Sequence, residues 1–199
     1  MTIQTGTFEV NTTVLFDHGR AWIVDPGAEA PRILELLAKR SLTPQAIFLT
    51  HAHFDHIGAV AEIVSAFPEL PVYVDPADAA VIDHPANQLP PDYPAQRRPK
   101  CLRDPSSGVD FPVELKVIKT PGHTPGGVCY HLPTEKLLLA GDTLFAGSVG
   151  RTDLPGGDMA TLMASLERLK ELPRETEVIP GHGMFTTVGR ELDGNPFLS

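Results

Sequence analysis

The chain has 199 residues, of which 42% are hydrophobic and 21% charged, a composition typical of a globular domain. Its net charge of −9 disfavours binding to nucleic acid through an overall positive field. No apolar run is long enough for a transmembrane helix, and the first ten residues lack the charged start and apolar core of a signal peptide.

The first part of the chain predicts a hairpin, followed by strands that alternate with helices. The predicted strands are 7–10, 13–17, 21–25, 46–50 and 72–74, and the predicted helices are 29–40, 56–67 and 76–82. Asp17-His18-Gly19-Arg20 is the predicted hairpin turn.

The stretch 84–112 differs from the rest, because it holds seven of the 20 prolines and has little periodicity. We predict a long loop or lid there. Strand patterns return at 113–120, 127–132, 136–140 and 176–179, and a strongly amphipathic helix is predicted at 158–172. No repeat or linker divides the chain, so we expect one domain over 1–199. This order of elements predicts an α/β fold with two sheets and helices packed outside them.

The strongest chemical motif follows the predicted strand 46–50. His51, His53 and His56 place three imidazoles near the carboxylate of Asp55, within six residues. Imidazole and carboxylate at this density suit Zn, Fe or Mn better than Mg or Ca, which prefer shells of oxygen. The alternative is a polar loop that happens to be rich in histidine.

Three further strand ends each present one ligand-type residue beside glycine. They are His123 in Pro-Gly-His-Thr, Asp142 in Gly-Asp-Thr and His182 in Pro-Gly-His-Gly. Glycine and proline fix tight turns and allow close backbone approach. Each motif alone is weak, but four such strand ends in one chain predict a single site.

The candidate ligands number seven, too many for one tetrahedral ion and suited to two. They are His51, His53, Asp55, His56, His123, Asp142 and His182. With Asp142 as a bridge, each ion has four protein ligands. Two such ions can hold a water as hydroxide near neutral pH and polarise a carbonyl, which predicts metal-assisted hydrolysis. The other histidines, His18, His84 and His131, are predicted to lie in turns or at the surface.

These motifs resemble those of the metallo-β-lactamase-fold hydrolases, over nearly the whole chain. The resemblance implies a four-layer αββα sandwich with two mixed β-sheets flanked by helices. It also implies that His51, His53 and His123 hold one metal, that Asp55, His56 and His182 hold the other, and that Asp142 bridges. True β-lactamases of this fold commonly have Cys at the position of Asp142, so the Asp here counts against that activity.

Within that superfamily, the stretches 141–145, 147–153 and 180–183 resemble the glyoxalase II-type hydroxyacylglutathione hydrolases. The ending, with Thr186-Thr187 and Asn195-Pro196-Phe197-Leu198, resembles their compact single-domain bacterial relatives. The resemblance implies a thioesterase that cleaves S-lactoylglutathione or a related acyl-thiol. Arg151 stands where the larger enzymes use a Lys to bind a glutathione carboxylate, and Asp153 stands where they use a substrate-contacting Tyr. We expect no counterpart of their C-terminal helical domain, which supplies further glutathione contacts. We hypothesise that the Pro-rich stretch 84–112, with Arg97, Arg98 and Lys100, replaces part of the glutathione-binding surface of those enzymes; a solvated loop is the alternative.

Two carboxylates receive supporting roles. Asp55 is the candidate catalytic residue, because it can take a proton as the nucleophile is generated. Asp25, in Asp-Pro-Gly at a strand end, is a candidate to orient a ligand histidine through its second ring nitrogen, and a purely turn-forming role is the alternative.

Three other functions stay open. The first is a persulfide dioxygenase with one iron on His51, His123 and Asp142, a facial triad that such enzymes of similar sequence use. The second is another small-ester or lactone hydrolase, and the third is a metal-binding module that has lost its chemistry.

The expected cofactors are two divalent ions per chain, with zinc first and iron or manganese as alternatives. The expected partner is a small acyl-thiol substrate, with no nucleic acid and no membrane; the oligomeric state is left open. Cys101 and Cys129 are too few for a disulfide framework, and free thiols fit a reducing compartment, so a cytoplasmic location is expected.

Overall fold

The computed structural model describes residues 1–198. Contacts divide the chain into two compact units, the first being Met1–Ser107 and the second beginning at Gly108. Each unit has its own β-sheet and its own cluster of buried hydrophobic side chains. The mixed α/β class with two mixed sheets and accompanying helices is confirmed, and the single domain over 1–199 stays a prediction.

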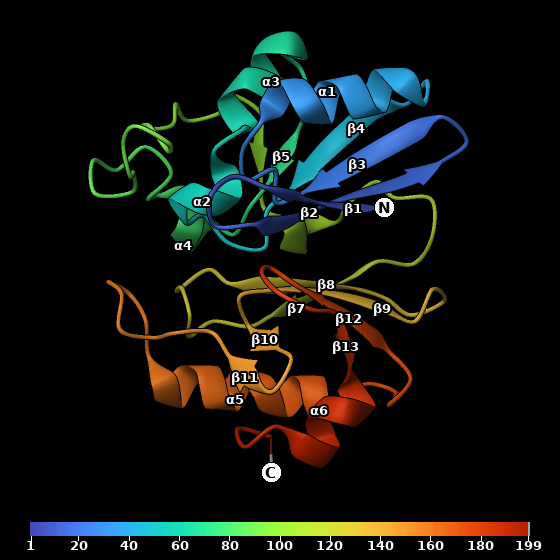
Figure 1. Cartoon of the computed structure of the whole chain (residues 1–199), viewed down its shortest axis with the longest axis vertical. Helices are drawn as coiled ribbons and strands as arrows, with labels where there is room; N and C mark the ends of the chain where they lie inside the picture. Colours follow the sequence, from blue (N-terminus) through green and yellow to red (C-terminus); the bar gives the residue numbers. More distant parts are fainter. Residues whose placement is uncertain (199) are drawn as a thin grey trace. The chain divides into compact units, whose positions relative to one another are not determined.

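The first unit is built on a six-stranded sheet in the order β1-β2-β3-β4-β5-β6 (Figure 1). Its strands are β1 (Thr2–Thr5), β2 (Val10–Asp17), β3 (Arg20–Val24), β4 (Thr43–Phe48), β5 (Val72–Tyr73) and β6 (Leu102–Arg103). The pairs β1–β2 and β2–β3 are antiparallel, and the other three are parallel. The sheet is therefore mixed, with its hairpins at the start of the chain.

The hairpin between β2 and β3 turns where the sequence predicts. His18 and Gly19 both have positive φ, 44° and 79°. Two successive positive φ values characterise the type I′ turn, whose twist matches that of the flanking strands. The earlier prediction of a strand at 7–10 is wrong, because the chain turns there, with positive φ at Gly6 and Glu9. Strand β1 precedes that turn and was not predicted.

The helices of the first unit are α1 (Ala30–Lys39), α2 (Phe54–Ile57), α3 (Val60–Ala66), α4 (Pro76–Ala79) and the 3₁₀ turn η1 (Pro105–Ser107). Helices α1 and α3 contact each other on one face of the sheet. Buried Ile33 of α1 and Ile63 of α3 belong to the same core cluster as Ile23 and Ile47 of the strands. Burying these apolar side chains is the main force that joins helices to sheet.

The predicted helix 56–67 is two helices with a break at Gly58. The Ala59 amide donates to the Pro26 carbonyl oxygen at 3.0 Å. A Cβ at Gly58 would collide with the Gly27 carbonyl oxygen, and a Cβ at Gly27 would collide with that of Asp55. Tertiary contact between two backbone segments thus overrides the helical pattern. Helix α4 also ends earlier than predicted, at Ala79.

The stretch 84–112 contains little regular structure, apart from β6 and η1. Its side chains are not all solvated, because Asn87, Tyr93 and Gln96 are buried. Leu89 and Tyr93 exchange backbone hydrogen bonds at 2.7 and 2.9 Å, which close a tight turn. Its role as a lid stays a prediction.

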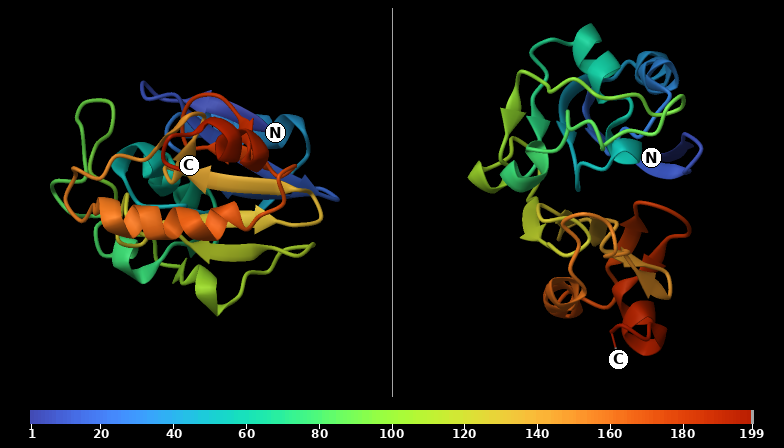
Figure 2. Two further views of the ribbon diagram at one scale, coloured as in Figure 1. Left: turned by 90° about the horizontal axis from the view of Figure 1, so that it is seen from below. Right: turned by 90° about the vertical axis from the view of Figure 1, so that its left-hand side faces the viewer.

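The second unit has a five-stranded sheet in the order β13-β12-β9-β8-β7 and a separate ribbon, β10-β11. The strands are β7 (Lys116–Lys119), β8 (Val128–Leu132), β9 (Leu137–Gly141), β10 (Leu144–Phe145), β11 (Ser148–Val149), β12 (Glu177–Pro180) and β13 (Thr186–Thr187). Only β12–β9 is parallel. Helices α5 (Met159–Lys170) and α6 (Val188–Gly194) lie on one face of this sheet (Figures 1 and 2).

Helix α5 is the clearest sequence prediction in this unit. Asp158 caps its first turn by accepting from the Thr161 amide at 2.7 Å. Leu162, Leu166 and Leu169 are all buried in the second core cluster. The unpredicted elements, such as β13 and α6, are short and lack such a pattern.

His131 corrects the prediction that it lies at the surface or in a turn. It lies in β8, one residue before the end of the strand, and is only 5% exposed. Neither ring nitrogen has a hydrogen-bond partner among residues 1–198. Burial lowers the pKa of this imidazole, and Lys116 lowers it further, against an opposing effect of Glu114.

Candidate metal centre

In the first unit, the candidate ligands lie in one segment, which begins in the loop after β4 and continues into α2. We call residues 51–56 the ligand loop. His51, Asp55 and His56 are buried, and His53 is half-buried. The ring centroids of His51 and His53 lie 4.9 Å apart in an edge-to-face arrangement. The two imidazoles on either side of Ala52 therefore project together, as a pair of ligands to one ion must.

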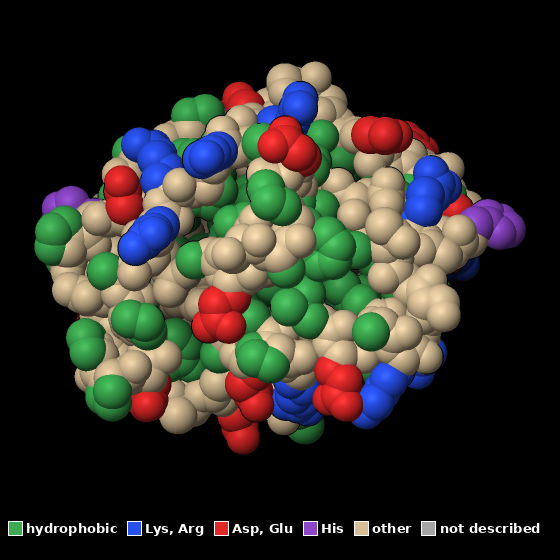
Figure 3. Space-filling model, turned by 90° about the horizontal axis from the view of Figure 1, so that it is seen from above, with side chains coloured by type: hydrophobic (Ala, Val, Ile, Leu, Met, Phe, Trp, Pro, Cys, Tyr) green, Lys and Arg blue, Asp and Glu red, His purple; other side chains and the backbone are tan. Residues whose placement is uncertain are grey.

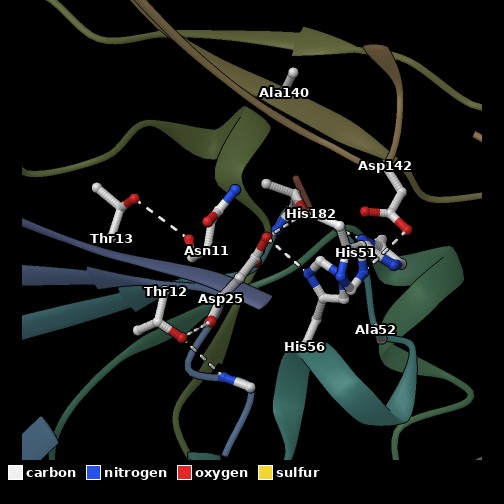
Figure 4. Close-up of polar contacts among 12 residues, drawn as sticks. Asn11, Thr12, Thr13, Asp25, His51, Ala52, His56, Ala140, Asp142 and His182 are labelled. Atoms are coloured by element: carbon white, nitrogen blue, oxygen red, sulfur yellow. Dashed lines mark hydrogen bonds and ion pairs between the residues drawn. The ribbon is translucent and has the colours of Figure 1, made fainter. Parts of the chain in front are cut away.

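Asp25 organises this loop from the end of β3 (Figure 4). Its Oδ1 accepts from the Thr50 amide at 2.7 Å, and its Oδ2 accepts from the Thr50 hydroxyl at 2.6 Å. The same Oδ2 lies 3.0 Å from His56 Nδ1. A carboxylate on one ring nitrogen fixes the tautomer and leaves the other nitrogen, Nε2, as the donor to a metal.

Threonine hydroxyls extend this network, and the sequence analysis missed them. Thr50 Oγ1 lies 3.1 Å from His51 Nδ1, so both buried histidines are oriented through Nδ1. Thr12 Oγ1 donates to the Asp25 carbonyl at 2.7 Å and accepts from the Gly27 amide at 3.2 Å. Asp25 itself has a φ of 47°, and these bonds fix that unusual backbone. The position of Thr50 directly before His51 was the available signal.

In the second unit, the candidate ligands come from three separate strand ends. His123 follows β7, Asp142 follows β9, and His182 follows β12. The Gly181 amide donates to the Gly141 carbonyl at 2.8 Å, which ties the last two turns together. His123 Nδ1 lies 2.7 Å from the Arg151 carbonyl oxygen, so Nε2 is again the remaining donor. No sequence signal marks a backbone carbonyl for this role.

The carboxylate of Asp142 faces two imidazoles of the same unit. Its Oδ2 lies 3.5 Å from His123 Nε2 and 3.6 Å from His182 Nε2, and Figure 4 shows the Asp142 and His182 side chains. These separations are longer than ordinary hydrogen bonds. A carboxylate placed between two histidine donors is the arrangement that a bridging ligand requires.

The donor set fits divalent metal ions. His51, His56 and His123 each have an orienting partner on Nδ1. Imidazole and carboxylate donors with such outer partners are typical of Zn, Fe and Mn sites.

The two predicted substrate-binding residues contact each other. Arg151 donates to both carboxylate oxygens of Asp153, from Nε and from a terminal nitrogen, at 2.7 Å each. Both side chains are exposed. The paired guanidinium holds the pKa of the Asp153 carboxyl down at about 2, and the carboxylate raises the pKa of Arg151. A substrate carboxylate on Arg151 would have to compete with Asp153.

The basic residues of the Pro-rich stretch line a cavity of about 340 Å³ in the first unit. Arg97, Arg98 and Lys100 surround it, together with apolar Val64 and Leu70. On the face that carries α1 and α3, several basic side chains lie beside hydrophobic atoms (Figure 3). The Arg98 guanidinium donates to the Ala79 carbonyl at 2.6 Å. A role in binding substrate stays a prediction.

Comparisons with known proteins agree on the family. The family model of the Metallo-beta-lactamase superfamily matches residues 5–182. Hydroxyacylglutathione hydrolase GloC of Haemophilus influenzae is 33% identical, over 99% of this chain and 96% of its own. The structure of TTHA1623 in a di-iron-bound form is 40% identical with a TM-score of 0.90, covering 100% of both chains. BLEG-1 B3 metallo-beta-lactamase is 39% identical with a TM-score of 0.92, covering 100% of this chain and 99% of its own.

Within residues 1–198, none of the helices has the length and apolar character needed to cross a membrane.

Proposed function

The chain belongs to the metallo-beta-lactamase superfamily, and we propose that this metallo-hydrolase is a thioesterase of the glyoxalase II type. The observation that carries the proposal is the Asp142 carboxylate, set between two imidazoles as a bridging ligand would be. The match to the family model supports it, because residues 5–182 include all seven candidate ligands. The similarity to GloC favours an acyl-thiol substrate such as S-lactoylglutathione.

We propose that the seven residues together hold two divalent ions, with zinc or iron favoured and manganese an alternative. The similar chain TTHA1623 has been observed in a di-iron-bound form, which supports two metals and keeps iron open. Bound there, such ions would supply hydroxide near neutral pH and polarise the carbonyl of the substrate.

The chain's own residues have separable roles in this reaction. Asp25 holds His56 through Nδ1, and the Arg151 carbonyl holds His123 in the same way. Asp55 takes a proton at its carboxylate from the attacking water. The C–S bond then breaks, and the sulfur leaves as a thiolate, which needs no strong general acid. The proton held by Asp55 then passes to the thiolate or to solvent, which restores the Asp55 carboxylate, so that water and thioester are converted to a carboxylic acid and a thiol.

Binding of the thiol carrier is assigned to cationic side chains. Arg151 matches a planar carboxylate with a bidentate guanidinium, as its pairing with Asp153 illustrates. The cavity lined by Arg97, Arg98 and Lys100 is the second candidate for an anionic group. Within residues 1–198, Cys101 and Cys129 are not joined in a disulfide, which fits a reducing compartment, and we propose that the enzyme works in the cytoplasm.

A second candidate function is β-lactam hydrolysis, which the similarity to BLEG-1 favours. The Asp at position 142 argues for the thioesterase, since β-lactamases of this fold commonly have Cys there. In this chain, either function would use the same seven candidate metal ligands, so the two differ in the substrate.

The test is metal analysis of the purified protein, followed by assays on three substrates under identical conditions. We expect two ions per chain and turnover of S-lactoylglutathione well above that of a β-lactam. Faster turnover of the β-lactam would overturn the thioesterase. One iron per chain, with oxygen consumed on glutathione persulfide, would show a dioxygenase instead.

A further inference from the structure

Ala52 is the residue between the two histidines of the ligand loop, and its side chain is fully buried. The methyl group belongs to the hydrophobic core cluster of the first unit. His51 and His53 project together from either side of it, as their ring contact shows. The backbone orientation of Ala52 therefore sets the direction of both imidazoles.

Both polar backbone groups of Ala52 are held by side chains from later in the chain. Its amide donates to Asp78 Oδ2 at 2.9 Å, and its carbonyl accepts from Asn87 Nδ2 at 2.8 Å. Both contacts are buried. With its methyl in the core, Ala52 is thus fixed at three points.

Each of the two holding side chains is itself anchored. Asp78 lies in α4, is fully buried, and its own amide donates to the Asp75 carbonyl at 3.0 Å. Asn87 donates its second amide hydrogen to the Val81 carbonyl at 3.1 Å. A buried carboxylate is costly unless hydrogen-bonded, so a polar side chain at position 78 needs a specific reason.

The Pro-rich stretch makes a second contact with the same loop, at Phe54. The ring of buried Tyr93 lies 5.3 Å from that of Phe54, edge to face, and 5.6 Å from that of Phe8. Phe54 separates His53 from Asp55 in the sequence. Asn87 and Tyr93 therefore fasten the ligand loop at two places.

We propose that Asp78 and Asn87 are positioning residues for the metal ligands, and we call this pair the brace. The brace fixes the backbone of Ala52 so that His51 and His53 converge before metal arrives, which lowers the cost of ordering them. The first part of the Pro-rich stretch is then a support of the site. This inference rests on the proposed metal centre.

The experiment compares Asp78→Ala and Asn87→Ala with Gln96→Ala. Gln96 is a matched control, since its buried amide lies in the same stretch and, within residues 1–198, bonds to the Pro94 carbonyl and not to the ligand loop. The dissociation constant for Zn²⁺ is measured by chelator competition, and the absorption spectrum of bound Co²⁺ reports the geometry of the ligands. Chemical denaturation of the metal-free proteins measures the stability of each variant.

We expect both brace variants to raise the Zn²⁺ dissociation constant by about 10–100-fold and to alter the Co²⁺ spectrum. The control should stay within about threefold of the wild type, by the same scale. Asp78→Asn keeps an oxygen acceptor for the Ala52 amide and should rescue most of the affinity. If Asp78→Ala does not fold, the test uses Asp78→Asn and Asn87→Asp. Asp78→Asn should keep most of the Zn²⁺ affinity, whereas Asn87→Asp should lose it, because an ionised Asp cannot donate to the Ala52 carbonyl.

Folded Ala variants with wild-type Zn²⁺ affinity and an unchanged Co²⁺ spectrum would overturn the brace and leave the proposed function intact. A wild-type protein that binds no metal would instead overturn the proposed function.

Discussion

The two units present their candidate ligands in different ways. In the first unit, four ligands fall within six residues of one loop, and side chains hold that loop: Asp25, Thr50, Asp78 and Asn87. In the second unit, three ligands come from three strand ends, and backbone groups hold them, such as the Arg151 carbonyl on His123. A clustered loop needs side chains to fix it, whereas a strand end is already fixed by the sheet.

The largest effect is expected in the second unit, at Asp142. Asp142→Ala removes the carboxylate between His123 and His182. We expect kcat/KM to fall by about 10³-fold or more, since loss of such electrostatic stabilisation has effects of this size. Steady-state kinetics and metal analysis check it. Asp193→Ala, at an exposed carboxylate of α6 that pairs with Arg174, is the control. An Asp142→Ala variant with two ions and nearly full activity would contradict the bridging role.

The next effect tests the side-chain support of the first unit. Asp25→Asn places an amide against Thr50 and His56, so one donor must face another donor. We expect metal affinity to fall by about 10–100-fold. Chelator competition measures it, and circular dichroism checks the fold. Unchanged affinity would mean that Asp25 serves only the turn.

A smaller effect is expected at Arg151, and it tests the backbone support of the second unit, because Arg151 holds His123 through its main-chain carbonyl. Arg151→Ala keeps that carbonyl, so we expect unchanged metal content and a KM for S-lactoylglutathione raised about tenfold, as for one lost charge-assisted contact. Asp153→Ala frees the guanidinium and should lower KM. A raised KM in Arg151→Ala together with a lowered KM in Asp153→Ala would support carboxylate binding at Arg151. Wild-type KM values in both variants would show that Arg151 does not bind the substrate.

The smallest effect concerns stability in the second unit. Burial lowers the pKa of His131, so the unfolded chain takes up its proton first as the pH falls below 6.5. Stability is therefore lost on acidification from that point until the pKa of the folded state is reached. In His131→Leu, the free energy of unfolding should fall less steeply with falling pH, by up to the contribution of one bound proton. Urea denaturation of the metal-free proteins between pH 7 and pH 5, a range that spans the usual histidine pKa, measures it. If the free energies of unfolding of the wild type and His131→Leu changed with pH in parallel, this prediction would be contradicted.

The candidate ligands could be selected from the sequence because their chemistry is local and dense, and their binding of metal stays a prediction. Histidine after a buried strand and beside glycine marks a site, and α5 was equally visible from its leucine spacing. Asn87 and the Arg151 carbonyl could not be predicted, since their partners lie 35 and 28 residues away. The break at Gly58 and the burial of His131 likewise depend on neighbours that only the tertiary fold brings close.

The pair Gly27 and Gly58 has a consequence for mutational libraries of this chain. Neither residue has a side chain that could bind metal or substrate, yet a Cβ at Gly27 would collide with the Asp55 carbonyl and a Cβ at Gly58 with the Gly27 carbonyl. In saturation mutagenesis under selection for activity, both positions should tolerate as little variation as the ligands do. Searches for similar sites can therefore use these two glycines as additional markers, even though they carry no chemistry of their own.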